Sequence, residues 1–178
     1  MFSAIQRLRD RDREGGFTLI ELMVVVMIIA ILIAIAVPAF FSARKRADDS
    51  SAKSSLQISL QDAQAVYTDA QVYVAQTATL TAGDMASILD SEEPNLDFFA
   101  NGTASANAKE ISVDTAASGT TGLDTIYFAA KSKSGKCFYL RHVSTPSATT
   151  AGTYKAEGAS TATCTAAAAA SVTTWVKA

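Results

Sequence analysis

The sequence predicts an α+β fold in which one long N-terminal helix packs on a small C-terminal antiparallel sheet. Three observations support this prediction. They are an almost uncharged apolar run near the N-terminus, an apolar stripe at helical spacing directly after it, and several short strand-like segments in the second half of the chain. The 178 residues provide for one membrane-associated segment and one modest domain.

Residues 17–43 form the apolar run, and Glu21 is their only charged side chain. The run is long enough to cross a bilayer as a helix, which takes about 20 residues. A lone carboxylate in lipid is costly unless it finds a partner, so Glu21 indicates assembly or transport rather than passive anchoring. Pro38 removes one backbone hydrogen bond, and we expect a kink or local loosening there without an end to the helix.

After the apolar run, apolar residues recur at spacings of three and four, with Ser, Gln and Asp between them. We therefore expect a single helix from about Thr18 to about Gln76, roughly 90 Å long at 1.5 Å per residue. Its second half is amphipathic and requires a globular domain to cover its apolar stripe. The stripe consists of Leu56, Leu60, Ala63, Tyr67, Ala70 and Val74.

The remaining chain predicts one short helix and several strands. The short helix is expected over residues 84–90, with Met85, Ile88 and Leu89 facing inward, followed by an anchored loop over residues 94–99. β-branched and aromatic residues predict the strands, and Gly135 lies in a polar loop that joins two of them into a hairpin. The expected strands cover residues 110–114, 124–130 and 137–143, with further strands at 154–157 and 172–176. Whether residues 166–170 form a helical turn is not decided by the local sequence.

The composition narrows the function classes. The net charge of −2 gives no global basic excess of the kind that nucleic-acid binding favours. With His142 as the single histidine, most histidine-based catalytic and metal schemes are removed. The acids between residues 84 and 97 lack the ligand spacing of a calcium loop, so an acidic surface is the favoured interpretation. We expect no catalytic site, no metal site and no cofactor.

Two cysteines, Cys137 and Cys164, lie far from the apolar run. In an exported domain such an even pair is read as one disulfide, whereas in a reducing cytosol it is more often two free thiols. The Lys and Arg counts on the two sides of the apolar run are balanced, so charge alone does not decide the orientation. We place the N-terminus inside, because the disulfide requires export of the domain.

The segment GGFTLIELM, residues 15–23, resembles the processing site of type IV pilins and the related pseudopilins. The resemblance implies that a prepilin peptidase cuts between Gly16 and Phe17 on the cytosolic side and methylates the new amino group of Phe17. It also implies three parts: a leader over residues 1–16, a transmembrane and assembly helix over 17–43, and an exported globular domain over 44–178.

The resemblance further implies that the Phe17 amine of one subunit meets the Glu21 carboxylate of a neighbour in a helical filament. Such a pair in a dry core is attractive only if both charges are well coordinated, so we interpret Glu21 as a device that sets register. The chain departs from the family in its leader with interleaved acids, and in Ala30, where many members have Gly. Local melting of the helix during assembly then depends on Pro38 alone.

The expected function is that of a structural subunit of an extracellular type IV pilus, supporting adhesion, motility or DNA uptake. Its partners are other copies of the chain, the peptidase, and an assembly platform in the cytoplasmic membrane, where the precursor is a single-pass protein. The alternatives are a type II secretion pseudopilin and a minor pilin that acts as tip adhesin or DNA receptor. DNA binding through the basic cluster Arg44–Lys45–Arg46 is the less favoured reading, because Asp48 and Asp49 follow directly.

Overall fold

The computed structural model describes residues 16–76, 82–116, 123–144, 151–158 and 163–178. The chain divides into two compact units, Met1–Ser42 and Ala43–Ala178. Helix α2, Leu19–Ala70, begins in the first unit and continues into the second without a break in its helical assignment. Among the described residues, the first unit consists of residues 16–18 and the apolar start of α2, whereas the second contains the sheet and the hydrophobic core.

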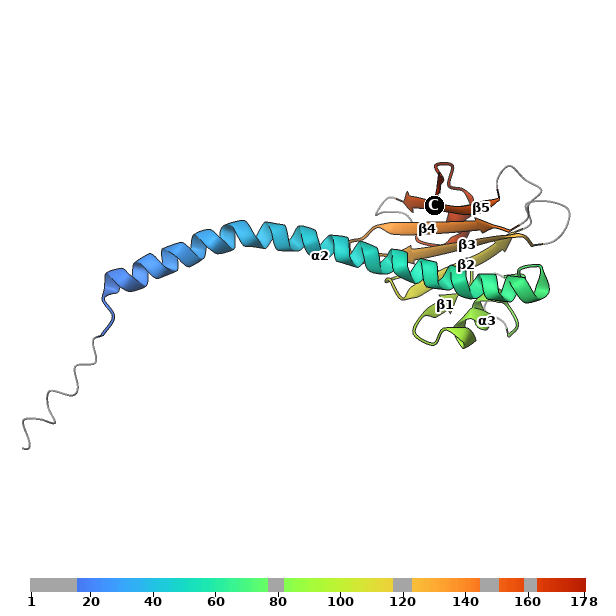
Figure 1. Ribbon diagram of the computed structural model, residues 1–178, viewed down its shortest axis with the longest axis horizontal. Helices are drawn as coiled ribbons and strands as arrows, with labels where there is room; N and C mark the ends of the chain where they lie inside the picture. Colours follow the sequence, from blue (N-terminus) through green and yellow to red (C-terminus); the bar gives the residue numbers. More distant parts are fainter. Residues whose placement is uncertain (1–15, 77–81, 117–122, 145–150, 159–162) are drawn as a thin grey trace, which may run out of the picture. The chain divides into compact units, whose positions relative to one another are not determined.

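The second unit contains a six-stranded sheet whose strands follow one another in chain order. Strand β1 is parallel to β2, and all later neighbours are antiparallel (Figure 1). The architecture is therefore the predicted long helix on a mostly antiparallel sheet. The elements after α2 are α3 (Met85–Glu92), β1 (Asp97–Phe99), β2 (Glu110–Ala116), β3 (Thr125–Lys131), β4 (Cys137–Val143), β5 (Gly152–Gly158), α4 (Ala166–Ala170) and β6 (Val176–Lys177).

The bounds of the central strands are close to those predicted from the sequence. Strand β4 has the expected bounds, β3 is displaced by one residue, and β2 and β5 are longer than expected. The hairpin between β3 and β4 is confirmed, with Lys131 opposite Cys137. Gly135 has a φ of 95° in the connecting turn, a backbone region that favours glycine.

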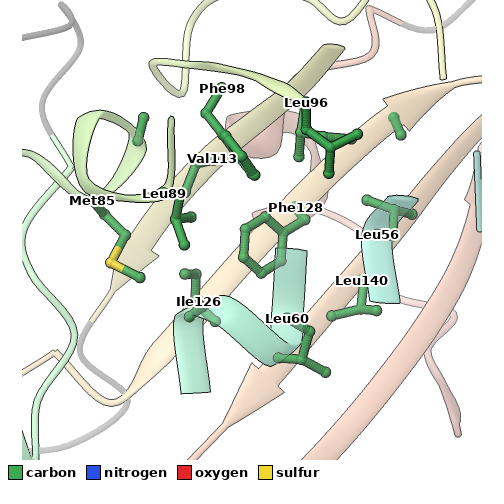
Figure 2. Packing of buried hydrophobic residues seen from close by; sticks show 14 of the residues in the cluster. Leu56, Leu60, Met85, Leu89, Leu96, Phe98, Val113, Ile126, Phe128 and Leu140 are labelled. Atoms are coloured by element: carbon green, nitrogen blue, oxygen red, sulfur yellow. The ribbon is translucent and has the colours of Figure 1, made fainter. Parts of the chain in front are cut away.

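The main core lies between the second half of α2 and one face of the sheet. Leu56, Leu60 and Ala63 are buried from the helix side, and Phe128 and Leu140 are buried from the sheet side (Figure 2). The predicted amphipathic stripe is therefore confirmed over this stretch of α2. The larger cluster also includes Met85, Leu89, Leu96, Phe98, Val113 and Ile126.

The helix ends at Ala70, earlier than the expected Gln76. Gln71 adopts a φ of 57°, a left-handed conformation typical of a helix C-terminus, and its N–H donates to the carbonyl of Tyr67. The turn allows Tyr73 to enter the core, where its hydroxyl accepts a hydrogen bond from Ser144 at 2.9 Å. The helix thus ends because Tyr73 contacts Ser144, which lies 71 residues later in the chain. Ala70, which was expected in the apolar stripe, is exposed.

Other elements differ from expectation in detail. The anchored loop over residues 94–99 contains the short strand β1, and of residues 172–176 only Val176 is in a strand. The open question at residues 166–170 is settled as helix α4, because the Thr165 side chain accepts a hydrogen bond from the N–H of Ala168 and caps it. In α3 Ile88 is only half-buried, whereas Met85, Ala86 and Leu89 are buried.

The second face of the sheet carries the disulfide. Cys137 and Cys164 are bonded, with their Cα atoms 5.6 Å apart, so the disulfide interpretation is confirmed. The bridge holds the C-terminal segment on this face, where Ala129, Tyr139, Ala156 and Ala169 form a second buried cluster. Half-buried Tyr127, Val172 and Trp175 pack against this cluster.

Candidate functional site

The start of α2 is held by reciprocal hydrogen bonds between Thr18 and Glu21. The Thr18 backbone N–H and hydroxyl both donate to Oε2 of Glu21, at 2.9 and 2.8 Å, and the Glu21 N–H donates to the Thr18 hydroxyl at 3.3 Å. A Thr that caps a helix and a Glu three residues later form the arrangement called a capping box. The lone carboxylate therefore has a partner within its own chain.

The capping box leaves part of the Glu21 carboxylate free. A carboxylate has about four acceptor sites, and both hydrogen bonds from Thr18 go to Oε2, so Oε1 accepts none within the described residues. Glu21 is exposed, as is Phe17 beside it. The site can hold its own helix start and still accept a cation from another molecule. Sequence reasoning missed the box, although the T-x-x-E pattern at residues 18–21 was sufficient to find it.

The apolar side chains of α2 before residue 42 are exposed around the whole helix. Among described residues, every exposed large hydrophobic except Ile58 and Val176 lies between Phe17 and Phe41, with Phe17 itself 89% exposed. An apolar surface of this extent requires cover by lipid or by other protein. By length and composition, α2 is the one helix among the described residues that meets the requirements for crossing a membrane.

The Gly16–Phe17 bond lies in non-helical chain directly before the cap. Gly16 and Phe17 are both exposed, and a side chain added at Gly16 meets nothing within 4 Å. The bond is therefore accessible without unwinding of a helical turn. Gly15 and the rest of the expected leader lie outside the described residues.

Pro38 lies inside α2, and the helix is assigned as continuous through it. The proline has no N–H to donate to the carbonyl of Ala34, so one rung of the helix lacks its hydrogen bond. The sequence expectation that the helix does not end here agrees with this assignment. Whether the missing bond produces a kink or loosening on assembly stays a prediction.

His142 lies close to polar side chains of two other elements, and no metal site is found among the described residues. His142 Nε2 lies 3.3 Å from the side-chain nitrogen of Gln64, and Nδ1 lies 2.9 Å from the Thr153 hydroxyl. Burial lowers the pKa of His142. Within the described ranges, no group of three or more His, Cys, Asp or Glu side chains is arranged to hold a metal ion.

One comparison with known proteins gives a match. The family model of the prokaryotic N-terminal methylation motif matches residues 11–37, which include the Gly16–Phe17 bond, Thr18, Glu21 and most of the apolar run. No curated protein and no solved structure matches the chain. The matched motif lies at the start of the exposed apolar helix, and the α+β domain follows it in the chain.

The matched motif and the long helix on a mostly antiparallel sheet are consistent with a type IV pilin-like or pseudopilin-like precursor. Its apolar N-terminal helix and its methylation motif fit a precursor that is anchored in a membrane. A motif of this type points to a structural subunit rather than an enzyme. The sequence-based resemblance over residues 15–23 agrees with the residues that the family model matches.

Proposed function

We propose that this protein is a structural subunit of an extracellular type IV pilus, which polymerises through its N-terminal apolar helix after removal of a leader. The observation that carries the proposal is the combination of an uncovered apolar helix with an exposed, capped Glu21 five residues after a Gly–Phe bond within the methylation motif. Adhesion, motility or DNA uptake would then be properties of the polymer.

Processing would divide the chain into a leader over residues 1–16, an assembly helix over 17–43 and an exported domain over 44–178. A prepilin peptidase would cut between Gly16 and Phe17 and methylate the Phe17 amine. The leader carries four Arg and three acids, so its removal takes the formal charge from −2 to −3, not counting the new amine. The precursor would lie in the cytoplasmic membrane with its N-terminus inside, next to an assembly platform.

The capping box suggests how Glu21 is tolerated before assembly. While the subunit waits in the membrane, Thr18 supplies hydrogen bonds to Oε2 and reduces the cost of keeping a carboxylate in an apolar environment. In the filament, Oε1 would receive the methylated Phe17 amine of a neighbouring subunit. The charge pair would set the register of the helices, because a buried ion pair specifies geometry better than it stabilises.

Most of the cohesion would come from apolar burial between neighbouring helices. The side chains from Phe17 to Phe41 expose a continuous apolar surface, and burial of such a surface contributes about 25 cal/mol per Å². Local loosening at Pro38 would give the helix freedom to adjust as it leaves the membrane. The globular domain would form the outer surface of the filament.

The test is mass spectrometry of filaments sheared from producing cells, with the N-terminus and the cysteines of this protein as readouts. The proposal expects an N-terminal methylated Phe17, with Cys137 and Cys164 joined, in abundant sheared material. Processed protein that stays in the membrane and is absent from sheared material would favour the secretion pseudopilin. An uncut N-terminus would overturn the proposal.

A matched variant sharpens this test. Gly16→Val should abolish cleavage without disturbing the fold, because a Cβ added at Gly16 meets no atom within 4 Å. The control is Gly102→Val, which also has open space around it and lies far from the cleavage bond in the sequence. If both variants are cleaved like the unaltered chain, recognition of Gly16 by the peptidase is excluded.

A further inference from the structure

The charges of the globular domain are divided between opposite edges of its sheet. Residues 84–97, which include α3 and the start of β1, contain five acidic side chains and no Lys or Arg. From residue 125 to the C-terminus there are six Lys or Arg side chains and one acid, a net side-chain charge of +5. Figure 1 shows α3 and β1 at one edge of the sheet and β5 with the C-terminus at the other.

The acidic edge is defined here as Asp62, Asp90, Glu92, Glu93 and Asp97. Oδ2 of Asp62 is buried and has no hydrogen-bond partner within the described residues. Burial raises the pKa of Asp62, and the nearby carboxylates of Glu93 and Glu92 raise it further. Negative charges thus lie close together at the acidic edge, and residues 84–97 contain no Lys or Arg to pair with them.

The basic edge is defined here as Arg141, Lys155 and Lys177, on β4, β5 and β6. Lys155 lies opposite Leu140 and Val176 on the face of the sheet that α2 covers, whereas Arg141 and Lys177 lie on the other face. Arg141 and Tyr154 lie opposite each other in the β4–β5 pairing, and Tyr154 lies opposite Lys177 in the β5–β6 pairing. The Arg141 guanidinium lies 4.6 Å from the ring centre of Tyr154 and 4.9 Å from that of Trp175. These two cation–π contacts hold the guanidinium in a fixed position on the outer face.

Among the described residues, no ion pair joins Arg141, Lys155 or Lys177 to an acidic side chain. Arg141 Nε is buried without a hydrogen-bond partner among the residues that the structure describes. The one acidic side chain after residue 125, Glu157, is 2.5 Å from Lys136 and is therefore already paired. The two undescribed stretches in this part of the chain, residues 145–150 and 159–162, contain no Asp or Glu.

Asp97 on β1 and Lys155 on β5 are too far apart to neutralise each other within one chain. Strands β1 and β5 are separated by four strand spacings, which is about 19 Å at the usual distance between neighbouring strands. Asp62 Oδ2 and Arg141 Nε are the two buried unpaired side-chain atoms of the described chain, and they belong to side chains of opposite sign. A second copy, translated and rotated, can bring one edge against the other.

We propose that the acidic edge of one globular domain binds the basic edge of the next copy of the chain, with Arg141, Lys155 and Lys177 facing Asp62, Glu92, Glu93 and Asp97. This inference rests on the proposed function, since it assumes that copies of the chain polymerise. The contact is heterologous, because different surfaces meet, and repetition of such a contact produces a helical filament when it does not close into a ring. The charges fix the order and register of the domains, while the apolar helices hold the filament together.

Carbodiimide cross-linking tests the contact directly, because this reagent joins a Lys amine to a carboxylate without a spacer. It is applied to intact membranes and to sheared filaments of the unaltered chain, followed by peptide mass spectrometry. The inference expects links from Lys155 or Lys177 to Glu92, Glu93 or Asp97, which must be intermolecular at a separation of about 19 Å or more. Absence of such links from both samples, or links from Lys155 and Lys177 only to other proteins, overturns it.

Charge reversal tests the energetics. Lys155→Glu should weaken the assembled state on the order of fivefold at low salt, with the difference shrinking as salt screens the charges. Lys133→Glu is the matched control, since Lys133 is also exposed but lies in the β3–β4 turn, away from the basic edge. The readout is the fraction of subunit released from filaments as salt is raised.

Exchange of signs at both edges completes the test. Glu92→Lys with Glu93→Lys, and separately Lys155→Glu with Lys177→Glu, should each weaken filaments, and the chain with all four changes should regain most of the loss. Filaments whose salt resistance is unchanged by either pair overturn the edge contact and leave the pilus proposal intact. Failure of the pilus proposal is recognised separately, by an uncleaved N-terminus in the mass spectrum of the unaltered chain.

Discussion

The two halves of helix α2 differ in what covers them. Before residue 43 no residue of the helix is buried, whereas beyond it Ala52, Ser55, Leu56, Ser59, Leu60 and Ala63 are buried against the sheet. The second half is amphipathic and already has its partner, while the first half is apolar on all sides and has none in the isolated chain. One continuous helix thus combines a folded interface with an interface that is still to be formed.

The largest expected effect concerns the uncovered half. Glu21→Ala should leave cleavage after Gly16 intact and abolish filament assembly, because it removes the acceptor for the neighbour's amine. Thr18→Ala is the comparison: it removes the cap, which costs about 1 kcal/mol of helix stability, but retains the carboxylate. N-terminal mass spectra and filament yield measure the two steps, and normal filaments from Glu21→Ala would contradict the assigned role in register.

An Ile→Ala substitution should lower domain stability where the side chain is buried and weaken filament assembly where it is exposed on α2. Ile126→Ala removes a fully buried side chain of β3 and should destabilise the domain by about 2–5 kcal/mol. Ile28→Ala changes a side chain that is 53% exposed in the first half of α2, so unfolding of the domain should be unchanged while assembly is weakened. Denaturant unfolding of the full chain in detergent, together with filament yield, separates these outcomes; equal losses of stability would remove the distinction between the halves.

Loss of the disulfide should affect the covered domain alone. The bridge joins positions 27 residues apart, and a loop of that size stabilises by roughly 3–4 kcal/mol in the chain-entropy model. The double variant Cys137→Ser/Cys164→Ser should lose about this amount in denaturant unfolding, and cleavage after Gly16 should continue. Reduction of the unaltered chain provides the control, since it should produce a similar loss without any substitution.

The smallest effect is a pH dependence at His142. Because burial lowers the pKa of His142 in the folded state, the unfolded chain binds a proton first as the pH falls. Stability should therefore decrease from about pH 7 downward through the unfolded pKa near 6.5, and level off below the folded pKa. His142→Gln should flatten this part of the profile of melting temperature against pH, and an unchanged slope would assign it to other groups.

The sequence was sufficient for features that depend on local periodicity. The stripe from Leu56 to Tyr67 predicted which side of α2 is covered, and β-branched and aromatic runs located β3 and β4. The helix end at Ala70 was not predictable, because it depends on Tyr73 reaching Ser144 across the fold. Strand β1 was missed for a similar reason, since its three residues acquire their identity only by pairing with β2.

The candidate site shows the same division. Gly16, Phe17 and Glu21 were found from one contiguous motif, and the Thr18 cap was within reach of the same pattern. The contacts of Arg141 with the Tyr154 and Trp175 rings were not, because they require the β4–β5 register and the return of the C-terminal segment onto the outer face. Residues that depend on two or more tertiary contacts lie beyond what a single sequence predicts.

The bridge between Cys137 and Cys164 also has a mechanical consequence. If a filament of these subunits is pulled until a domain opens, the chain between the two cysteines cannot extend. A separation of 27 residues corresponds to roughly 90 Å of extended chain that the bond withholds at about 3.5 Å per residue. In single-molecule pulling, the contour length released on opening should therefore be shorter by that amount than after reduction, and the C-terminal part should resist load as a closed loop.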